Sequence, residues 1–339
     1  MIRSPRAVTT TVTVATIALV VALAGACATG REDAGDLSTP ATATQAAGSD
    51  APGTSASTGT TPGSSSPSTG SCAATDQIAH RDEVYATTDA DPKLTSLDVY
   101  EAVRPEGCGP APILFWVHGG GWQQGDKGNQ LSDKKRLAAE QGWTLVSLNY
   151  RLTPAVQYPV PNQDVADGIG WFLAHAAQFN ADPSRTAVMG HSAGGGIVAA
   201  VSTDERYLAN AGRSLDDLDC LVSLDTEGYD VTKKGDDGGI YDAMFGTDPA
   251  AWPDQSPVNH VRAGAGIPDT FIVTRGSAAR LANAHAFADA LTTAGVPTTI
   301  IETRSLDHNG VNDAVGAPED TLITPKLVPF LDACLGTPT

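Results

Sequence analysis

The sequence predicts an α/β fold in which helices cover both faces of a mostly parallel central sheet. From Ala111 onward, short apolar runs typical of buried strands alternate with longer stretches of helical pattern. Residues 118–122 read HGGGW and directly follow the first of these strands. Residues 190–194 read GHSAG and stand between a later strand and the helix that they open. Ligands of such sheets gather beyond the carboxyl ends of the strands, which is where both motifs lie.

The strands and helices are expected in the following order. A hairpin opens the domain, and buried strands such as ILFWV, TLVSL, CLVSL and TFIVT then alternate with helices. The expected strands are at about 81–86, 95–103, 113–117, 144–148, 186–189, 220–224, 270–274 and 298–303, and the helices are near 133–141, 164–179, after Ser192, at 282–294 and near 325–334.

Composition limits the class of partner. The chain has 339 residues, which permits one large domain or two modest ones, and 41% of them are hydrophobic, enough for a substantial core. Lys and Arg number 21 against 39 Asp and Glu, so the formal net charge is −18. An anionic polymer would be repelled, which argues against a nucleic-acid partner and against a polybasic membrane patch.

Residues 1–26 have the pattern of a secretory signal. Arg3 and Arg6 precede an apolar run at 17–23 and the small residues at 24–26. The apolar run is shorter than the roughly 20 residues that a membrane-spanning helix needs, so we expect export rather than a retained anchor. Cys27 resembles the lipidated cysteine of a bacterial lipobox, although an ordinary signal-peptidase site fits the same letters. The protein is therefore expected to be a cell-envelope lipoprotein, touching the membrane only through this lipid, or a secreted protein.

Residues 27–71 are expected to form a disordered linker after the signal segment. All but seven of the 44 residues from 28 to 71 are Ala, Gly, Ser, Thr or Pro, and such a composition cannot build a core. The folded domain is then expected to comprise residues 72–339.

Four cysteines remain in this domain, an even number that predicts two disulfides in an exported protein. Cys72 precedes the first strand of the hairpin and Cys108 follows the second, so an antiparallel pairing brings them together. Cys220 begins a late strand and Cys334 ends the last helix, which places both at one end of the domain. We predict the pairs Cys72–Cys108 and Cys220–Cys334, and no metal site, because no CxxC or histidine cluster accompanies them.

The GHSAG motif predicts a nucleophile at Ser192. A tight turn between a strand and a helix requires small residues at 190 and 194, so that the serine hydroxyl projects from the turn. The N–H of Ala193 would then point into the same space. The glycines at 119–121 can turn further N–H groups toward one point, as a developing oxyanion requires. A phosphate-binding loop is the alternative, but no Lys and Ser/Thr pair follows the glycines.

Four segments together resemble the α/β-hydrolase esterases: HGGGW at 118–122, NYRL at 149–152, DP at 182–183 leading to GHSAGG at 190–195, and SPVNHV at 256–261. The most similar groups are the bacterial feruloyl/acetyl-xylan esterase type and the hormone-sensitive-lipase type, and the resemblance covers about residues 81–335. It implies an α/β-hydrolase fold, Ser192 as nucleophile, an oxyanion hole formed by Gly120, Gly121 and Ala193, and a histidine base after the last strand. The histidine before Ser192 favours the feruloyl-esterase and arylformamidase side of this resemblance.

His308 is the expected base because it follows the strand at 298–303, in the order nucleophile, acid, base. His260 and His285 are the alternatives, one between strands and one within a helix. His118 and His191 are expected to support the glycine run and the serine turn.

The expected acid is displaced. The resemblance implies an Asp a few residues after the strand at 270–274, but residues 276–280 read GSAAR and contain no acid. Asp225, which ends the preceding strand, is expected to orient the imidazole of His308 instead. Glu227 and Asp307 remain alternatives.

These features predict a serine esterase that forms an acyl-enzyme on short-acyl or aryl esters, either small molecules or esters linked to polysaccharide, with no cofactor. Trp122 and Tyr158 are expected to line the substrate pocket. The segment 227–268 is expected to form a lid that carries Tyr229, Tyr241, Met244, Phe245 and Trp252. Three alternatives stay open: an arylformamidase, a lipase-like hydrolase, and a catalytically weak hydrolase fold that acts as a binding module at the envelope. The oligomeric state is not predicted.

Overall fold

The computed structural model describes residues 72–233 and 238–336. The predictions for the signal segment 1–26, for Cys27 and for the linker 27–71 lie outside these described residues. Within the described part, no helix combines the length and the apolar character that crossing a membrane would require.

One eight-stranded sheet organises the domain, with the strand order β1-β2-β4-β3-β5-β6-β7-β8. The first strand pairs antiparallel with the second, and the second pairs antiparallel with the fourth. All other neighbours are parallel, so the predicted mostly parallel sheet is confirmed. The strands are β1 (Asp76–Val84), β2 (Ser96–Val103), β3 (Ala111–Val117), β4 (Thr144–Leu148), β5 (Ala181–His191), β6 (Cys220–Leu224), β7 (Asp269–Thr274) and β8 (Thr298–Glu302).

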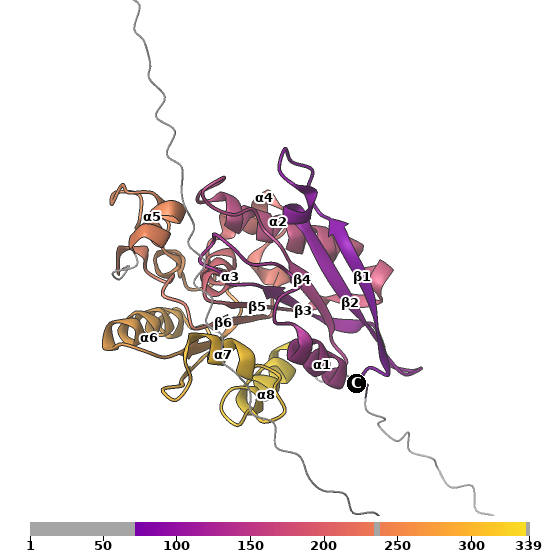
Figure 1. Ribbon diagram of the computed structural model, residues 1–339. Coiled ribbons are helices and arrows are strands. Elements are labelled where there is room, and N and C mark those ends of the chain that lie inside the picture. Colours follow the sequence, from indigo (N-terminus) through magenta and orange to yellow (C-terminus); the bar gives the residue numbers. More distant parts are fainter. Residues whose placement is uncertain (1–71, 234–237, 337–339) are drawn as a thin grey trace, which may run out of the picture. The chain divides into compact units, whose positions relative to one another are not determined.

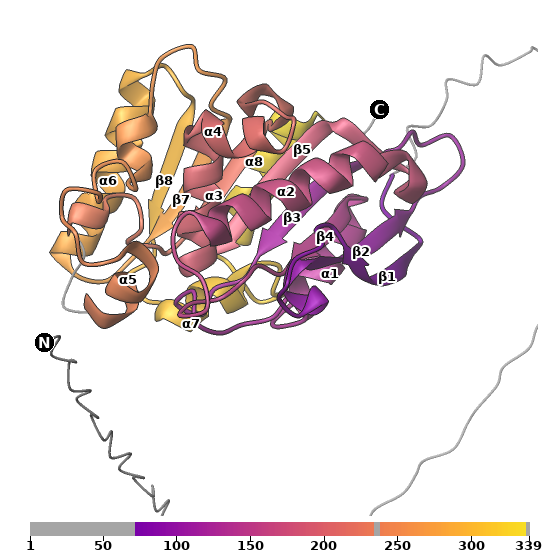
Figure 2. The same cartoon turned by 90° about the horizontal axis from the view of Figure 1, so that it is seen from above.

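Helices cover both faces of this sheet (Figure 1). The view from above shows the long helix α2 crossing the strands, with α3, α4 and α6 on the same side (Figure 2). Helices α1, α7 and α8 lie on the opposite face (Figure 1). The helices are α1 (Ser132–Gln141), α2 (Val160–His175), α3 (Ala193–Thr203), α4 (Glu205–Asn210), α5 (Gly238–Phe245), α6 (Ala278–Thr293), α7 (His308–Ala314) and α8 (Thr324–Leu335).

Alternate residues of the central strands face different cores. In β3, Phe115 packs in the cluster that contains residues of α2 and α3, whereas the neighbouring Trp116 packs in the cluster with α1 and α8. All seven residues of β3 are buried, so this strand has no solvent-facing side. The continuous apolar run at 111–117 is the consequence, because a strand between two helical layers buries both of its faces.

Strand β1 differs from the expectation, since it begins at Asp76 rather than at about 81. It is an edge strand whose residues are mostly exposed, polar and apolar alike, so it lacks the alternation of buried apolar and exposed polar residues that predicts a strand from sequence. Its pairing register shifts between His80 and Glu83, where Asp82 adopts a φ of 56°. Backbone pairing with β2 therefore defines this strand, and hydrophobic periodicity does not.

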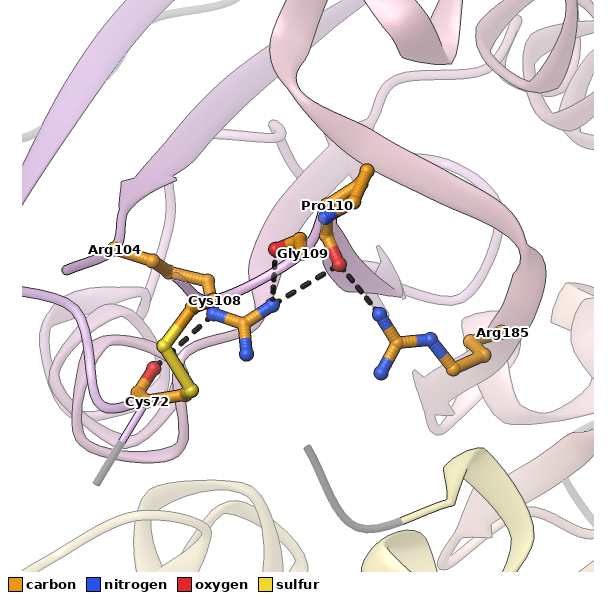
Figure 3. The surroundings of a disulfide bond; sticks show 6 residues. All are labelled: Cys72, Arg104, Cys108, Gly109, Pro110 and Arg185. Carbon is orange, nitrogen blue, oxygen red and sulfur yellow. Dashed lines mark hydrogen bonds between the residues drawn. A yellow bond between two sulfur atoms is a disulfide. The ribbon is translucent and has the colours of Figure 1, made fainter. Parts of the chain in front are cut away.

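Both predicted disulfides are present. The Cα atoms of Cys72 and Cys108 lie 5.9 Å apart, and those of Cys220 and Cys334 lie 6.0 Å apart. Figure 3 shows that the Arg104 side chain extends from the first disulfide toward residues 109–110. Its guanidinium donates to the carbonyl of Cys72 at 3.2 Å and to the carbonyl of Gly109 at 2.7 Å. Arg104 thus fastens both ends of the first disulfide loop.

The second disulfide is expected to contribute strongly to stability, because it links residues 114 positions apart and so restricts a long loop of the unfolded chain. Replacing Cys220 and Cys334 together by Ala should lower the free energy of unfolding by about 4 kcal/mol. Urea denaturation without reductant measures this loss. Peptide mapping of the unreduced wild type should yield only the two pairs, and a titratable thiol at any of the four positions would contradict the pairing.

Candidate active site

Ser192 lies in a strained turn between β5 and α3. Its φ of 55° and ψ of −119° place a residue that is not glycine in the left-handed half of backbone space. A Cβ atom on Gly190 would lie 2.4 Å from the carbonyl oxygen of Gly194, and a Cβ on Gly194 would lie 2.2 Å from the carbonyl oxygen of Val117. Both positions therefore require glycine, which is the steric reason for the GHSAG pattern.

Ser192, His308 and Asp225 form one chain of hydrogen bonds across three elements. Nε2 of His308 is 2.8 Å from Oγ of Ser192, and Nδ1 is 2.6 Å from Oδ2 of Asp225. His308 is the first residue of α7, and Asp307 caps this helix by accepting from the N–H of Gly310. The imidazole is thus held at both nitrogens, in the arrangement that lets a histidine accept a proton from a serine hydroxyl.

Asp225 is fully buried at the end of β6. Its φ is 47°, and its N–H donates to the carbonyl of Val273 at 2.7 Å. Two guanidinium groups reach its carboxylate: Arg275 Nε donates to Oδ2 at 2.7 Å, and Arg280 Nε donates to Oδ1 at 2.8 Å. Burial opposes ionisation, but the hydrogen bond to His308 and the two arginine charges outweigh it, so the pKa of this carboxyl lies below its usual value.

The other candidate acids are engaged elsewhere. Glu227 pairs with Nη1 of Arg280 at 3.1 Å, and the Asp307 carboxylate caps α7. The alternative bases also have other partners. His285 contacts Glu302 at 3.0 Å, and Nε2 of His260 lies 2.7 Å from the carbonyl oxygen of Asp254. The structure therefore brings only Asp225 and His308, among these candidates, into one chain with Ser192.

Two neutral histidines support the site. The ring of His191 lies 4.6 Å from the ring of His308, and its Nε2 donates to the His308 carbonyl oxygen at 2.9 Å. Burial, together with the neighbouring His308, lowers the pKa of His191 to about 3. His118 stacks on Tyr150 with ring centroids 4.5 Å apart, and burial lowers its pKa also. Both rings therefore pack around the reactive groups without adding positive charge at neutral pH.

The glycine run approaches Ser192 closely. A Cβ on Gly119 would lie 3.0 Å from the Cβ of Ser192, and Gly120 and Gly121 have φ values of 113° and 61°. The N–H groups of Gly120, Gly121 and Ala193 have no hydrogen-bond acceptor among residues 72–233 and 238–336. The Ala193 N–H also begins helix α3, whose N-terminus favours negative charge. These donors can receive an oxyanion.

Hydrogen bonds hold this loop in place. Tyr150 donates its hydroxyl hydrogen to the carbonyl of His118 at 3.0 Å. The N–H groups of Gln123 and Gln124 both donate to the carbonyl of Gly120 at 3.1 Å. The NYRL segment at 149–152 therefore supports the glycine run through Tyr150.

A cleft of about 1140 Å³ surrounds Ser192 and His308. Trp122 lines it, and Ile240 and Tyr241 of α5 contribute to its wall. The charged side chains of its lining are two acids and two arginines, Asp225, Glu227, Arg275 and Arg280, and these pair with one another. The remaining polar side chains of the rim are mainly amides: Gln123, Gln124, Asn129, Gln130 and Asn309.

Tyr158, which was expected to line the pocket, is not among the residues that line this cleft. Its ring packs against Tyr207 and Phe245, and its hydroxyl donates to the carbonyl of Asp254 at 3.4 Å. Phe245 in turn contacts Trp122 with ring centroids 5.3 Å apart, so Tyr158 lies one aromatic ring behind the cleft wall. Sequence reasoning could not distinguish these two layers of aromatic residues.

The segment predicted as a lid is only partly a cover. Helix α5 reaches the cleft through Ile240 and Tyr241, and a Cβ on Gly121 would lie 3.2 Å from Ile240. Tyr229 is buried in the core instead, stacked on Phe287 at 4.6 Å. Met244 and Phe245 are also core residues, and Trp252 packs against the same cluster.

One group of side chains has the composition of a metal site. The potential ligand atoms of His191, Asp225 and His308 lie within 4.8 Å of one another. Each of them already makes hydrogen bonds. His191 donates to the carbonyl of His308, Asp225 accepts from His308 and Arg275, and His308 also contacts Ser192. The hydrogen-bonded chain with Ser192 accounts for this cluster.

Fold and site together define an α/β hydrolase. The chain belongs to this family: the family model described as alpha/beta hydrolase fold matches residues 114–312, which are more than half of the chain. Among curated proteins it is similar to "Probable carboxylic ester hydrolase LipM" of Mycobacterium tuberculosis, with 33% identity over 118 residues, which cover 34% of this chain and 27% of the relative. It is also similar to arylacetamide deacetylase of Oryctolagus cuniculus, with 40% identity over 93 residues, which cover 26% of this chain and 23% of the relative. The chain thus spans less than a third of the length of these relatives.

Solved structures show the same fold. Esterase B of Lactobacillus rhamnosis has a TM-score of 0.63 at 20% identity, covering 77% of this chain and 87% of its own. A truncated carbohydrate esterase from gut microbiota also has a TM-score of 0.63, at 18% identity, covering 76% of this chain and 96% of its own.

Sequence reasoning missed Arg275 and Arg280. Both belong to the segment after β7 in which the resemblance implies an acid. Two arginines beside a missing acid were the available signal, because a carboxylate supplied from the neighbouring strand would need partners there.

Asp225→Asn tests whether this carboxylate orients His308. The amide keeps the shape but favours the wrong imidazole tautomer, and in a serine protease such a change lowers turnover by about 10⁴. We expect a fall of that order in the kcat for ester hydrolysis, with little change in substrate binding. The matched controls are Glu227→Gln and Asp307→Asn, which should retain far more activity. An Asp225→Asn protein within about threefold of wild type would exclude Asp225 as the orienting acid, since that loss is only about 0.7 kcal/mol.

Proposed function

We propose that this protein is a serine esterase that hydrolyses carboxylic esters through an acyl-enzyme. One observation carries the proposal: the hydroxyl of Ser192 lies within hydrogen-bond reach of His308, which lies within reach of Asp225, beside backbone N–H groups that have no other acceptor among the described residues. The names of the curated relatives, a carboxylic ester hydrolase and a deacetylase, support the same chemistry.

The proposed reaction has two halves. His308 accepts the hydroxyl proton while Oγ of Ser192 attacks the ester carbonyl, and the same imidazole then gives the proton to the departing alcohol. In the second half, His308 takes a proton from the water that attacks the acyl-serine. The imidazolium then returns this proton to Oγ of Ser192 as the acyl–oxygen bond breaks and the acid is released. General acid–base catalysis of this kind contributes about 10² to 10⁴ in rate.

The charge that develops on the carbonyl oxygen is stabilised by the oxyanion hole. The donors are the N–H groups of Gly120, Gly121 and Ala193, which the backbone fixes before the substrate arrives. Each well-placed donor is worth about 3 to 4 kcal/mol of barrier.

The acyl side of the proposed substrate is short. One turn beyond Ser192, a Cβ on Gly196 would already lie 3.3 Å from Oγ1 of Thr226 and 3.8 Å from Trp122. The space behind Trp122 is a cavity of only about 10 Å³, close to the volume that one water needs. A short acyl group fits this geometry better than a fatty acyl chain.

The alcohol side is proposed to face the amide-lined rim and the side chains of Ile240 and Tyr241. The open, polar cleft suits small aryl esters and esters carried on polysaccharide. The carbohydrate esterase among the structures of the same fold makes the second class worth testing.

Export to the cell envelope, or secretion, remains part of this proposal. Two disulfides within one domain support it, because they persist in oxidising compartments. Metabolic labelling with palmitate, with Cys27→Ala as control, distinguishes a lipoprotein from a freely secreted protein.

Ser192→Ala is the first test of the chemistry. The change removes only the hydroxyl, so the fold should persist while ester hydrolysis falls to background. Covalent labelling by an organophosphonate should disappear as well, and mass spectrometry of the labelled wild type should locate the adduct on Ser192. Labelling at another residue, or persistent turnover in the variant, would contradict the proposal. If the wild type hydrolyses no ester at all, the binding-module alternative is favoured.

A substrate panel tests the short acyl pocket. The kcat/KM for p-nitrophenyl esters should be highest at acetate to butyrate and fall by at least about tenfold by octanoate, because one excess methylene costs about 1 to 3 kcal/mol in a closed pocket. Matched aryl formamides and long-chain triglycerides separate the arylformamidase and lipase-like alternatives. A preference for long chains would contradict the pocket assignment.

A further inference from the structure

We infer that Arg280, assisted by Arg275, is a positioning residue for the displaced acid: it holds Asp225 in its strained conformation against His308 and balances its charge, which sets the pH at which His308 can act as base. This inference rests on the proposed serine chemistry. It assigns the two arginines a part in the site that neither the GHSAG motif nor the glycine run contains.

The contacts use every acceptor of Asp225. Oδ2 accepts from Nδ1 of His308 and from Nε of Arg275, whereas Oδ1 accepts from Nε of Arg280. Nη2 of Arg280 also donates to the backbone carbonyl of Asp225 at 2.6 Å. The guanidinium of Arg280 therefore hydrogen-bonds both to the carboxylate and to the main-chain carbonyl of this residue.

This grip has a steric reason. Asp225 has a φ of 47°, a conformation that a residue other than glycine keeps only where its surroundings fix it. The Asp225 N–H is bonded to Val273, and Arg280 secures the carbonyl on the other side of the same Cα. Without Arg280, the hydrogen bonds left to the Asp225 carboxylate within the described part of the chain would be those from Arg275 and His308.

Charge supplies the second reason. The charged groups that face His308 and Asp225 are Glu227 on the connection after β6, Arg275 after β7, Arg280 on α6 and Asp307 at the start of α7. The remaining neighbour, β5, contributes the neutral ring of His191, and Lys134 of α1 donates to the carbonyl of Asn312 on α7 at 2.9 Å. Asp225 and Glu227 pair with Arg275 and Arg280, and Asp307 and Lys134 add one charge of each sign, so the charges around His308 balance.

This balance affects protonation of the base. Removing one arginine charge leaves a net negative environment, which favours the imidazolium and so delays the appearance of the free base as pH rises. The lower limb of the pH profile of kcat/KM should then move to higher pH.

Two substitutions of Arg280 separate grip from charge. Arg280→Gln removes the charge and most of the hydrogen bonds to Asp225. The midpoint of the lower limb of the pH profile should therefore move to higher pH by about 1 unit. The kcat should fall by about tenfold, while KM changes less than about twofold. Arg280→Lys keeps the charge but cannot reproduce the fork, so kcat should fall while the limb stays within about 0.3 unit of wild type. The control is Arg262→Ala, which removes an exposed guanidinium paired with Glu205 and should change neither quantity.

Several results would overturn the inference. If Arg280→Gln changes neither kcat nor the lower limb of the pH profile, Arg280 neither positions Asp225 nor balances its charge. A large rise in KM with an unmoved limb would show instead that Arg280 binds substrate. If Arg280→Gln does not fold, Arg275→Gln removes a single bond to the same carboxylate, and the same upward movement of the limb is required of it.

A second measurement does not depend on turnover. In protein labelled with ¹³C-histidine, the titration midpoint of the His308 ring signal should lie at higher pH in Arg280→Gln than in wild type and should be unchanged in Arg262→Ala. Equal midpoints in all three proteins would overturn the inference even for an active enzyme. Failure of the proposed function is a different result, namely turnover or labelling that survives in Ser192→Ala.

Discussion

The carboxylate of Asp225 is the point on which the site depends. It is fully buried, yet it is ionised because one imidazole and two guanidinium groups surround it. A buried charge is costly unless every acceptor is paired, and here each oxygen of the side chain and the main-chain carbonyl has a donor. The same contacts join the ends of β6 and β7 to the first turn of α7. Loss of this one carboxylate would therefore remove the acceptor of Nδ1 of His308 and of Nε of both arginines.

Steric limits on the backbone prepare the other half of the site. Ser192 is held at positive φ because Gly190 and Gly194 allow β5, α3 and β3 to approach more closely than any side chain permits. The glycine run closes over the serine for the same reason, and Tyr150 fixes it through the His118 carbonyl. The donors of the proposed oxyanion hole are thus part of the folded backbone, so no side chain needs to move to form it.

The position of Asp225 shows that either of two adjacent strand ends in a parallel sheet can supply a carboxylate to the same imidazole. Adjacent strands lie about 4.8 Å apart, so the carboxyl ends of β6 and β7 are both within reach of one imidazole. In this chain β6 supplies the proposed acid, Asp225, and the segment after β7 supplies the two arginines that bind its carboxylate. The carboxylate still accepts from Nδ1 of His308, but it comes from the end of β6 and not from the segment after β7, where the resemblance to the esterases implies it.

The sequence by itself determined the features that depend on local sterics and pattern: the mostly parallel sheet, the turn at Ser192, the glycine run and, through an even cysteine count and the order of elements, the disulfide pairs. Only the tertiary structure brought Asp225, rather than Glu227 or Asp307, to the imidazole of His308. It also placed Tyr158 outside the cleft lining, began β1 at Asp76 and placed Arg280 against the Asp225 carboxylate. The physical reason is range. A glycine turn is specified by its immediate neighbours, whereas Asp225 meets a histidine 83 positions away and an arginine 55 positions away. Which carboxylate lies within 3 Å of that imidazole is fixed by strand register and helix placement, and no local pattern encodes either one.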